Sequence, residues 1–235
     1  MLPLCNDFIS QFLKDFIPNN AEGIFISEDL DSFSFYKDCN PYIECDEFDS
    51  EYMGYSYLIK LGTSKLCIVF SDFDAAIKLP ANGLFSIDYE DPYFYARYSE
   101  DVISNTIENE IAIYSQVSYN TKKFLMPNIF CMEVNGIKVY KQEKIKETYA
   151  DNRLKREESN PLTPDVLSTF PKTFCPFPKF FEYEILENYS AGRDIIEETS
   201  FLSDIHYENI GYSYSNMPVC FDYGGYGSES FKFSS

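Results

Sequence analysis

Three short apolar segments, each closed by a turn signal, limit the possible folds more than any other feature of this chain. The segments span residues 57–61, 66–70 and 75–80. Gly62 opens the turn after the first segment, and Pro80 ends the third. Segments of this length and composition are typical of β-strands, and connections this short join antiparallel neighbours. The sequence therefore predicts an antiparallel sheet in this part of the chain.

A strong helical pattern follows the three segments at residues 101–117. Ile107 and Ile111 recur at helical spacing, and Asp101 stands at the end where the helix dipole favours a negative charge. A second amphipathic helix is predicted near the N-terminus, at residues 7–17. The sheet and the helix at 101–117 are expected to form one lobe.

Two hairpins are also predicted. Asn135-Gly136 lies between strand-like residues 129–132 and 137–140, and this dipeptide strongly favours a two-residue turn. A shorter hairpin is predicted at 210–221.

The remaining segments carry weaker signals. Residues 21–56 are acidic and rich in Tyr and Phe, and we expect them to be irregular, while 81–100 resemble an acidic aromatic insertion. Residues 146–165 are charged and interrupted by Asn, Ser and Pro, which is typical of a crossover between lobes. The expected organisation is a helix with an acidic aromatic extension at 1–54, a first lobe at 55–145 and a second lobe at 146–235.

The charge of the chain restricts its partners. Its 38 acidic and 19 basic residues give a formal net charge of -19, which argues against direct nucleic-acid binding because a phosphate backbone attracts Lys and Arg. The 20 Tyr and 22 Phe exclude an acidic disordered chain, because disordered segments lack apolar material to bury. We expect a globular protein that either repels polyanions or docks on a basic surface of another protein.

The cysteines and the N-terminus indicate a reducing compartment. Seven cysteines are scattered through the chain, and His206 is the single histidine, so we expect buried free thiols rather than a zinc site. The sequence has no signal-peptide pattern, and no apolar run approaches the roughly 20 residues of a membrane helix. We therefore expect a cytoplasmic protein that does not associate with membranes.

The most informative motif lies near the C-terminus. Asp204 precedes Asn209 by five positions, and Asp222-Tyr223-Gly224 follows the shorter hairpin. A nucleotide-bound magnesium ion needs hard oxygen ligands, which one carboxylate and one amide from adjacent turns can supply. A second carboxylate must face the incoming hydroxyl to accept its proton. This pattern resembles the catalytic core of the protein-kinase-like superfamily.

The resemblance implies a role for each of these residues. Asp204 would be the catalytic base, and Asn209 and Asp222 would hold Mg²⁺ on ATP. Upstream, the Ala-Ile-Lys that ends at Lys78 resembles the strand whose lysine holds the ATP phosphates. Glu110 would orient Lys78 from the helix at 101–117.

Three further points follow from the resemblance. Glu108 is an alternative to Glu110, because its neighbours give it nearly the same environment. The turn Gly62-Thr63-Ser64 lies where a phosphate-covering hairpin belongs. The segment that would read adenine through backbone groups, as part of the cofactor site, comprises Gln142, Glu143 and Lys144.

The sequence also departs from the family pattern. One glycine, Gly62, stands where the family has three, and Ser203 replaces the arginine that usually precedes the catalytic aspartate. Because residues 225–235 follow Gly224 in this sequence, we expect no activation segment. The chain therefore resembles a minimal kinase, similar to compact phage-type serine/threonine kinases.

These observations predict an α+β fold of the two-lobed protein-kinase-like type. Its first lobe would be an antiparallel sheet with one main helix, and its second a small, truncated helical lobe. The expected function is ATP- and Mg²⁺-dependent phosphate transfer to Ser or Thr of a protein, in the host cytoplasm if the chain is viral. The alternative is a catalytically inactive, kinase-like acidic binding protein, such as a viral inhibitor that occupies a host protein. One form of this alternative is an inhibitor whose acidic surface mimics nucleic acid.

Overall fold

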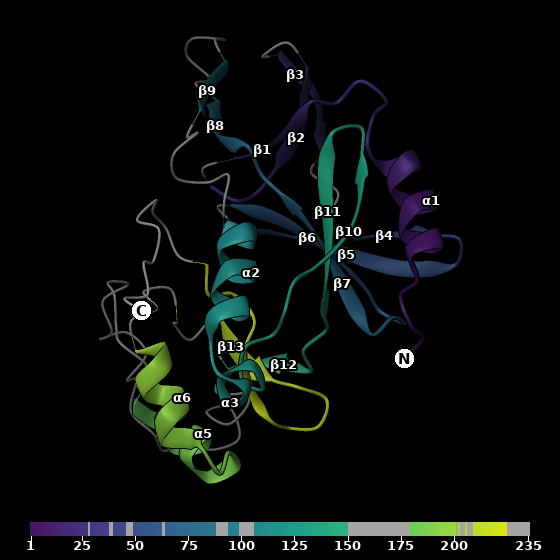
Figure 1. The fold of residues 1–235 in the computed structure, drawn as a ribbon. Helices are drawn as coiled ribbons and strands as arrows, with labels where there is room; N and C mark the ends of the chain where they lie inside the picture. The colour runs from purple at the N-terminus through teal and green to yellow at the C-terminus, as the bar shows by residue number, and fades with distance from the viewer. Residues whose placement is uncertain are drawn as a thin grey trace, which may run out of the picture. The chain divides into compact units, whose positions relative to one another are not determined.

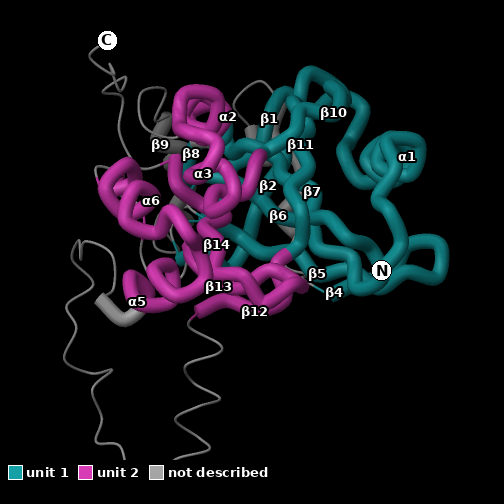
Figure 2. Tube along the Cα trace, turned by 60° about the horizontal axis from the view of Figure 1, so that its bottom comes forward, with its two compact units in different colours: residues 1–107, 128–144, 226–235 teal, residues 108–127, 145–225 magenta. Residues whose placement is uncertain are grey.

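The computed structural model describes most of the chain as an α+β fold with several antiparallel sheets (Figure 1). The described residues are 1–27, 29–37, 40–45, 49–62, 64–87, 94–98, 106–149, 179–200, 202, 205 and 209–224. They belong to two compact units (Figure 2). Unit 1 contains residues 1–107 and 128–144, and unit 2 contains residues 108–127 and 145–225.

Unit 1 is built on a six-stranded antiparallel sheet with the order β10-β11-β7-β6-β5-β4. The antiparallel sheet predicted from the three apolar segments is therefore confirmed. Its strands are β4 (Asp49–Tyr52), β5 (Tyr55–Gly62), β6 (Lys65–Phe70), β7 (Ala75–Pro80), β10 (Ile129–Val134) and β11 (Ile137–Glu143).

The predicted hairpin at Asn135-Gly136 connects β10 to β11. Asn135 has φ 52° and Gly136 has φ 81°, so both central residues are left-handed. This is the backbone of a two-residue hairpin turn whose twist matches the flanking strands. The Asn135-Gly136 dipeptide alone specifies this turn, and the predicted hairpin is confirmed.

Helix α1 (Asn6–Phe16) packs its apolar side against this sheet, as predicted for residues 7–17. The rings of Phe8 and Phe12 lie 5.2 and 5.1 Å from the ring of Phe70, each in an edge-to-face arrangement. Ile9 and Leu13 are fully buried on the same helix. Aromatic and aliphatic side chains of α1 thus close one face of the sheet.

A second sheet in unit 1 corrects the expectation for the acidic aromatic segments. Residues 21–56 were expected to be irregular, but they form three strands of this sheet as well as β4, and residues 81–100 contribute two more. The sheet order is β3-β2-β1-β8-β9, with β1 and β8 parallel. Its strands are β1 (Gly23–Ser27), β2 (Phe33–Lys37), β3 (Asn40–Cys45), β8 (Gly83–Ile87) and β9 (Phe94–Tyr98).

Unit 2 combines helices with a small sheet. The three-stranded sheet has the order β12-β13-β14. The helix predicted at 101–117 is confirmed as α2 from residue 106, and residues 101–105 lie outside the described residues. The elements are α2 (Thr106–Gln116), α3 (Tyr119–Lys122), α5 (Lys179–Asn188), α6 (Gly192–Thr199), β12 (Glu147–Thr148), β13 (Ile210–Tyr212) and β14 (Pro218–Cys220).

The small sheet needs a glycine in its central strand. A Cβ placed on Gly211 would collide with the carbonyl oxygen of Glu147 in β12. Glycine therefore permits β12 and β13 to approach closely enough to pair through Thr148 and Gly211. In the part of the chain that the structure describes, no helix is long and apolar enough to cross a membrane.

Candidate functional site

The six-stranded sheet has two chemically different faces. Successive strand residues project to opposite faces, and directly paired residues of antiparallel strands project to the same face. The face covered by α1 carries the apolar core of unit 1. The core residues from these strands include Ile59, Leu66, Ile68, Phe70, Ile77, Leu79 and Val139.

The second face, opposite α1, carries the predicted phosphate-binding lysine. Lys60 pairs with Cys67, Cys67 with Lys78, and Lys78 with Tyr140. These four residues therefore form one row across four strands. Lys78 is only 4% exposed, so it is not an ordinary surface lysine.

Gln142, predicted for the cofactor site, shares the second face with Lys78. It pairs with Ala76, which in turn pairs with Val69. Gln142 is also 4% exposed. The structure thus brings Lys78 and Gln142 together on adjacent strands, two positions apart along the sheet.

The predicted phosphate-covering turn lies at the end of the same sheet. Gly62 pairs with Lys65, which closes the turn between β5 and β6. Ser64 is buried, and its carbonyl oxygen accepts a 2.9 Å hydrogen bond from the N–H of Ala81. Thr63 lies outside the described residues.

Lys65 is a residue that sequence reasoning missed. It pairs with Pro80 in β7, which places it on the second face, and it is 4% exposed. A lysine directly after a turn is usually solvated, so the residue type alone predicts exposure rather than burial. The available signal was alternation along β6, where Leu66 and Ile68 face the core and Lys65 and Cys67 face away.

The segment predicted to read adenine extends β11 beyond its neighbour β10. The pairing of β10 with β11 starts at Ile129 and Lys141, whereas Gln142 and Glu143 pair with β7. One edge of the Gln142–Glu143 backbone therefore continues past the end of β10.

The Lys144 side chain contacts a turn of unit 1. Its Nζ donates to the carbonyl oxygens of Phe70 and Ser71 at 2.9 and 3.0 Å. The backbone N–H of Lys144 donates to the backbone carbonyl oxygen of Asp74 at 2.8 Å. Burial lowers the pKa of Lys144, and the charge of Asp72 opposes that shift. Lys144 thus stabilises the connection between β6 and β7, and its role toward a cofactor stays a prediction.

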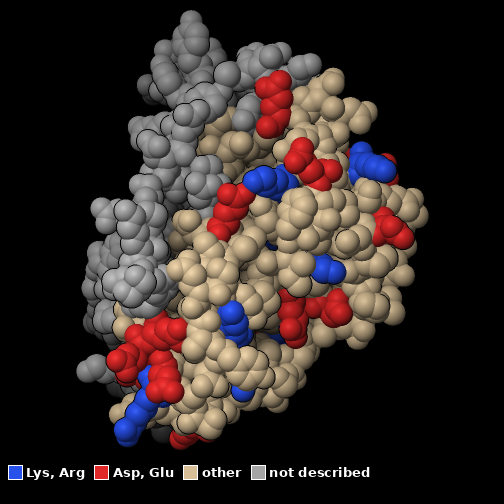
Figure 3. All heavy atoms as spheres, viewed as in Figure 1, with Lys and Arg blue, Asp and Glu red and all other residues tan. Residues whose placement is uncertain are grey.

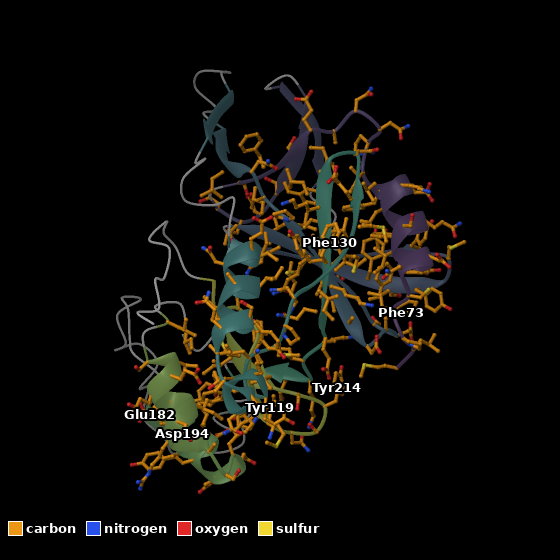
Figure 4. All side chains as sticks on the ribbon, in the orientation of Figure 1. Phe73, Tyr119, Phe130, Glu182, Asp194 and Tyr214 are labelled. Atoms are coloured by element: carbon orange, nitrogen blue, oxygen red, sulfur yellow. The ribbon has the colours of Figure 1, made fainter. Side chains whose placement is uncertain are left out.

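In unit 2, the β13–β14 hairpin aligns the two predicted metal ligands. Ile210 pairs with Cys220, and the N–H of Phe221 donates to the carbonyl oxygen of Asn209 at 3.0 Å. Asn209 and Asp222 therefore lie at the same open end of the hairpin. The turn at the other end carries Tyr214, which Figure 4 labels. Asn209 is 9% exposed, and Asp222 is half-buried.

The segment that follows α3 supports this hairpin from the other side of β14. Cys220 donates its N–H to Phe124 at 2.9 Å, and Met126 donates its N–H to Cys220 at 2.8 Å. The phenol of Tyr223 donates to the carbonyl oxygen of Met126 at 3.1 Å. The residues on both sides of Asp222 are thus tied to one buried segment.

Tyr223 is almost completely buried, at 1% exposure. Burial raises the pKa of Tyr223 far above its ordinary value, and the negative charge of Glu110 raises it further. Glu110 is fully buried, whereas Glu108 is exposed. Glu110 therefore belongs to the surroundings of the Asp-Tyr-Gly motif in unit 2. Its predicted ion pair with Lys78 of unit 1 stays a prediction.

The predicted catalytic base, Asp204, lies outside the described residues. Its neighbours Leu202 and Ile205 are both buried in the core of unit 2. The N–H of Leu202 donates to the carbonyl oxygen of Thr199 at 3.0 Å, at the end of α6.

Helix α6 is held in place by a carboxylate. Glu198 accepts hydrogen bonds from the N–H and the hydroxyl of Ser118, both at 2.7 Å, and from the hydroxyl of Thr121. Partial burial pushes the pKa of Glu198 up, but the hydrogen bonds from Thr121 and Ser118 outweigh it and lower the pKa overall. The ionised carboxylate thus joins α6 to the first turn of α3.

Exposed acidic side chains gather over α5 and α6, where Figure 3 shows a dense cluster of red atoms. Glu182 and Asp194 mark its place on the two helices (Figure 4). Glu187, Asp194 and Glu197 are exposed there, Glu182 is half-buried, and Arg193 is the basic residue of α6. Across the described parts of the chain, no three His, Cys, Asp or Glu side chains gather closely enough to hold a metal ion by themselves.

Comparison with known proteins gives little beyond this geometry. No family model and no curated protein matches the chain. Among solved structures it is similar to the apo form of PpkA-294, with 16% sequence identity and a TM-score of 0.36. The match covers 74% of this chain, and the chain spans 60% of the length of that structure.

Proposed function

We propose that this chain is an ATP- and Mg²⁺-dependent phosphotransferase of the protein-kinase type that acts on Ser or Thr of a protein. One observation carries the proposal: the hairpin hydrogen bond between Phe221 and Asn209 brings Asn209 and Asp222 to one end of two adjacent strands. The sequence motif independently predicts that these two residues hold one metal ion.

The donor set fits magnesium. Asn209 offers an amide oxygen and Asp222 a carboxylate, and both belong to the hard oxygen ligands that Mg²⁺ prefers. Mg²⁺, when bound, neutralises charge on the phosphates of the nucleotide. The buried Tyr223 and the paired backbone of Asn209 limit the motion of both ligands, so little ordering remains when the ion binds.

The second face of the six-stranded sheet supports the nucleotide role. Lys78 would hold the phosphates there, and Gln142 lies beside it on β11. The backbone of Gln142 and Glu143, which continues past β10, would offer hydrogen bonds to the adenine ring. Gly62, Thr63 and Ser64 would cover the phosphates from the turn.

Asp204 and Glu110 complete the proposed machinery. Asp204 would accept the proton of the acceptor hydroxyl and orient its oxygen toward the phosphate. Glu110 would fix the ammonium of Lys78, and its complete burial favours it over Glu108 for this role. Positioning and charge neutralisation would supply almost all of the rate.

Transfer of label from γ-³²P-ATP tests the proposal, with the chain itself and a Ser/Thr peptide library as acceptors. Transfer should require Mg²⁺, and Asp204→Asn should lower it by about 10²–10⁴-fold while ATP binding persists, because the proton acceptor is lost and the shape is kept. A wild-type protein that neither binds Mg²⁺–ATP nor transfers label contradicts the proposal.

The acidic surface on α5 and α6 favours a second candidate, a kinase-like protein that binds a basic host protein without catalysis. Exposed Glu187, Asp194 and Glu197 would meet Lys and Arg of that partner. Charge reversal of these three residues should then abolish the biological effect, whereas Asp204→Asn should leave it intact. The opposite pattern supports the phosphotransferase.

A further inference from the structure

We propose that Glu198 is a positioning residue that holds the segment of the proposed catalytic base, Asp204, in place relative to the proposed metal ligands. This inference rests on the proposed phosphotransferase and adds to it a residue that belongs to none of the sequence motifs. Glu198 lies in the last turn of α6, six positions before Asp204. It acts through the backbone and not by contact with ATP or the acceptor.

The Glu198 carboxylate connects α6 to the start of α3, and the two helices lie side by side in unit 2 (Figures 1 and 2). One carboxylate oxygen accepts from the N–H of Ser118, and the other accepts from the hydroxyls of Ser118 and Thr121. We call these three hydrogen bonds the Glu198 clamp. Thr121 is fully buried, so the clamp has a closely packed partner on the side of α3.

The position of Glu198 is unfavourable for α6 itself. A helix carries partial negative charge at its C-terminal end, so a carboxylate in its last turn is destabilising unless groups outside the helix compensate it. The last turn of α6 contains no basic residue. The donors of Ser118 and Thr121, together with the positive charge of Lys122, supply the compensation. The carboxylate therefore serves the contact between the two helices rather than α6 alone.

The end of α6 leads directly into the segment of Asp204. The N–H of Leu202 donates to the carbonyl oxygen of Thr199, the last residue of α6, at 3.0 Å. Leu202 and Ile205, which stand on either side of Asp204 in the sequence, are both buried in the core of unit 2. A displacement of the end of α6 is therefore passed to the backbone that carries Asp204.

The other side of the Glu198 clamp is continuous with the hairpin of the proposed metal ligands. The carbonyl oxygen of Thr121 accepts from the N–H of Phe124 at 2.9 Å. Phe124 and Met126 in turn form the two backbone hydrogen bonds that hold Cys220 of β14. The clamp thus joins the segment of the base to the framework of the metal ligands. The hydrogen bonds of that framework do not include Glu198, so we expect it to persist when the clamp is lost.

Single-turnover phosphate transfer and calorimetric titration with Mg²⁺–ATP, on wild type and Glu198→Gln, test the inference. Because misplacement of a reacting group by about 1 Å can cost a hundredfold in rate, Glu198→Gln should lower the transfer rate by about tenfold to a hundredfold. Its affinity for Mg²⁺–ATP should stay within about threefold of wild type, because the metal ligands keep their framework. Glu198→Asp, which keeps the charge on a shorter side chain, should recover part of the rate.

Tyr189→Phe is the matched control for a loss of stability. The Tyr189 hydroxyl donates to the carbonyl oxygens of Lys123 and Pro218, so its removal destabilises unit 2 without removing a bond of the Glu198 clamp. Ser200→Ala is the local control, because it removes an exposed hydroxyl that donates to the carbonyl oxygen of Glu197 beside the clamp. Both variants should transfer phosphate within about twofold of the wild-type rate when they are folded.

Three results overturn the inference. If wild type transfers phosphate and Glu198→Gln transfers it equally fast, Glu198 has no positioning role and the proposed function stands. If Glu198→Gln loses affinity for Mg²⁺–ATP by the same factor as rate, Glu198 acts on the fold as a whole. If Tyr189→Phe loses as much rate as Glu198→Gln, the rate follows stability rather than the clamp.

Amide hydrogen exchange tests the inference without relying on activity. Glu198→Gln should speed exchange of the Leu202 N–H by at least about tenfold and leave that of the Cys220 N–H unchanged. If Glu198→Gln does not fold, Ser118→Ala replaces it, because it removes one exposed hydroxyl of the clamp and should produce a smaller change in the same direction. Unchanged exchange at Leu202 contradicts the inference whether or not wild type transfers phosphate. A folded wild type that transfers no phosphate contradicts the proposed function and, with it, the positioning role.

Discussion

Phe221 and Asn209 are joined by a backbone hydrogen bond of 3.0 Å at the open end of the β13–β14 hairpin. Because Asp222 directly follows Phe221, the backbone itself keeps Asp222 beside Asn209. The proximity of the two proposed metal ligands therefore does not depend on a side-chain contact.

We predict that Tyr223→Phe lowers the free energy of unfolding by about 1–3 kcal/mol, because the Met126 carbonyl loses a buried donor. Chemical denaturation measures this change. Tyr214→Phe is the control, because Tyr214 is 45% exposed at the hairpin turn, and its effect should stay within about 0.5 kcal/mol. Equal effects of the two substitutions on the free energy of unfolding would show that the hydrogen bond from the Tyr223 hydroxyl to Met126 does not stabilise the fold.

A second prediction separates the two glutamates of α2. Glu110→Gln should lower the rate of phosphate transfer by at least about tenfold, since the role proposed for Glu110, orienting Lys78, requires its charge. Glu108→Gln should leave the rate almost unchanged, because Glu108 is exposed. Single-turnover transfer rates of the two variants, with melting curves to confirm folding, make the comparison. A larger loss of rate in Glu108→Gln than in Glu110→Gln would contradict the prediction, because it would show that Glu108 rather than Glu110 orients Lys78.

The elements predicted correctly from the sequence are those with a local signal. The turn at Asn135-Gly136 is specified by two residues that tolerate a left-handed backbone. Helix α1 follows from the spacing of its aromatic residues. In the candidate site, the five-residue step from Asp204 to Asn209 and the Asp-Tyr-Gly at 222–224 predict the metal ligands from the sequence. The hairpin pairing places Asn209 and Asp222 at one end of two strands, and their role as ligands stays a prediction.

The parts that were missed depend on distant segments. Strand β1 pairs in parallel with β8, through Phe25 and Gly83, and nothing near either residue specifies that partner. The Tyr- and Phe-rich segments therefore looked irregular. Lys65 was missed for the same reason, because the burial of a lysine is decided by tertiary packing rather than by its neighbours in sequence.

A third prediction concerns alkaline pH. Burial raises the pKa of Tyr189 to about 12 from the ordinary value of 10.0. The folded state therefore favours the neutral phenol, whose hydroxyl donates to the carbonyl oxygens of Lys123 and Pro218 at 3.1 and 2.6 Å. Below pH 10 the full contribution of Tyr189 to stability is present. Above pH 10 the Tyr189 phenol ionises first in the unfolded chain, so its contribution to stability falls until about pH 12.

Urea unfolding between pH 8 and 12 measures this loss. Tyr189→Phe should be less stable than wild type at pH 8, because its hydrogen bonds are gone, but its stability should fall less steeply above pH 10. Tyr214→Phe should keep the slope of wild type. An unchanged slope in Tyr189→Phe would show that this phenol does not control the alkaline transition.

The most direct test of the account is a calorimetric titration of ATP into wild type and Asp222→Asn, with and without Mg²⁺. We predict saturable, Mg²⁺-dependent binding to wild type. Asp222→Asn should weaken binding by about tenfold or more in Mg²⁺, because a charged ligand of the ion is lost, and should leave Mg²⁺-free binding unchanged. Equal affinities of the two proteins in Mg²⁺ would contradict the metal site, and the absence of ATP binding to wild type would contradict the phosphotransferase itself.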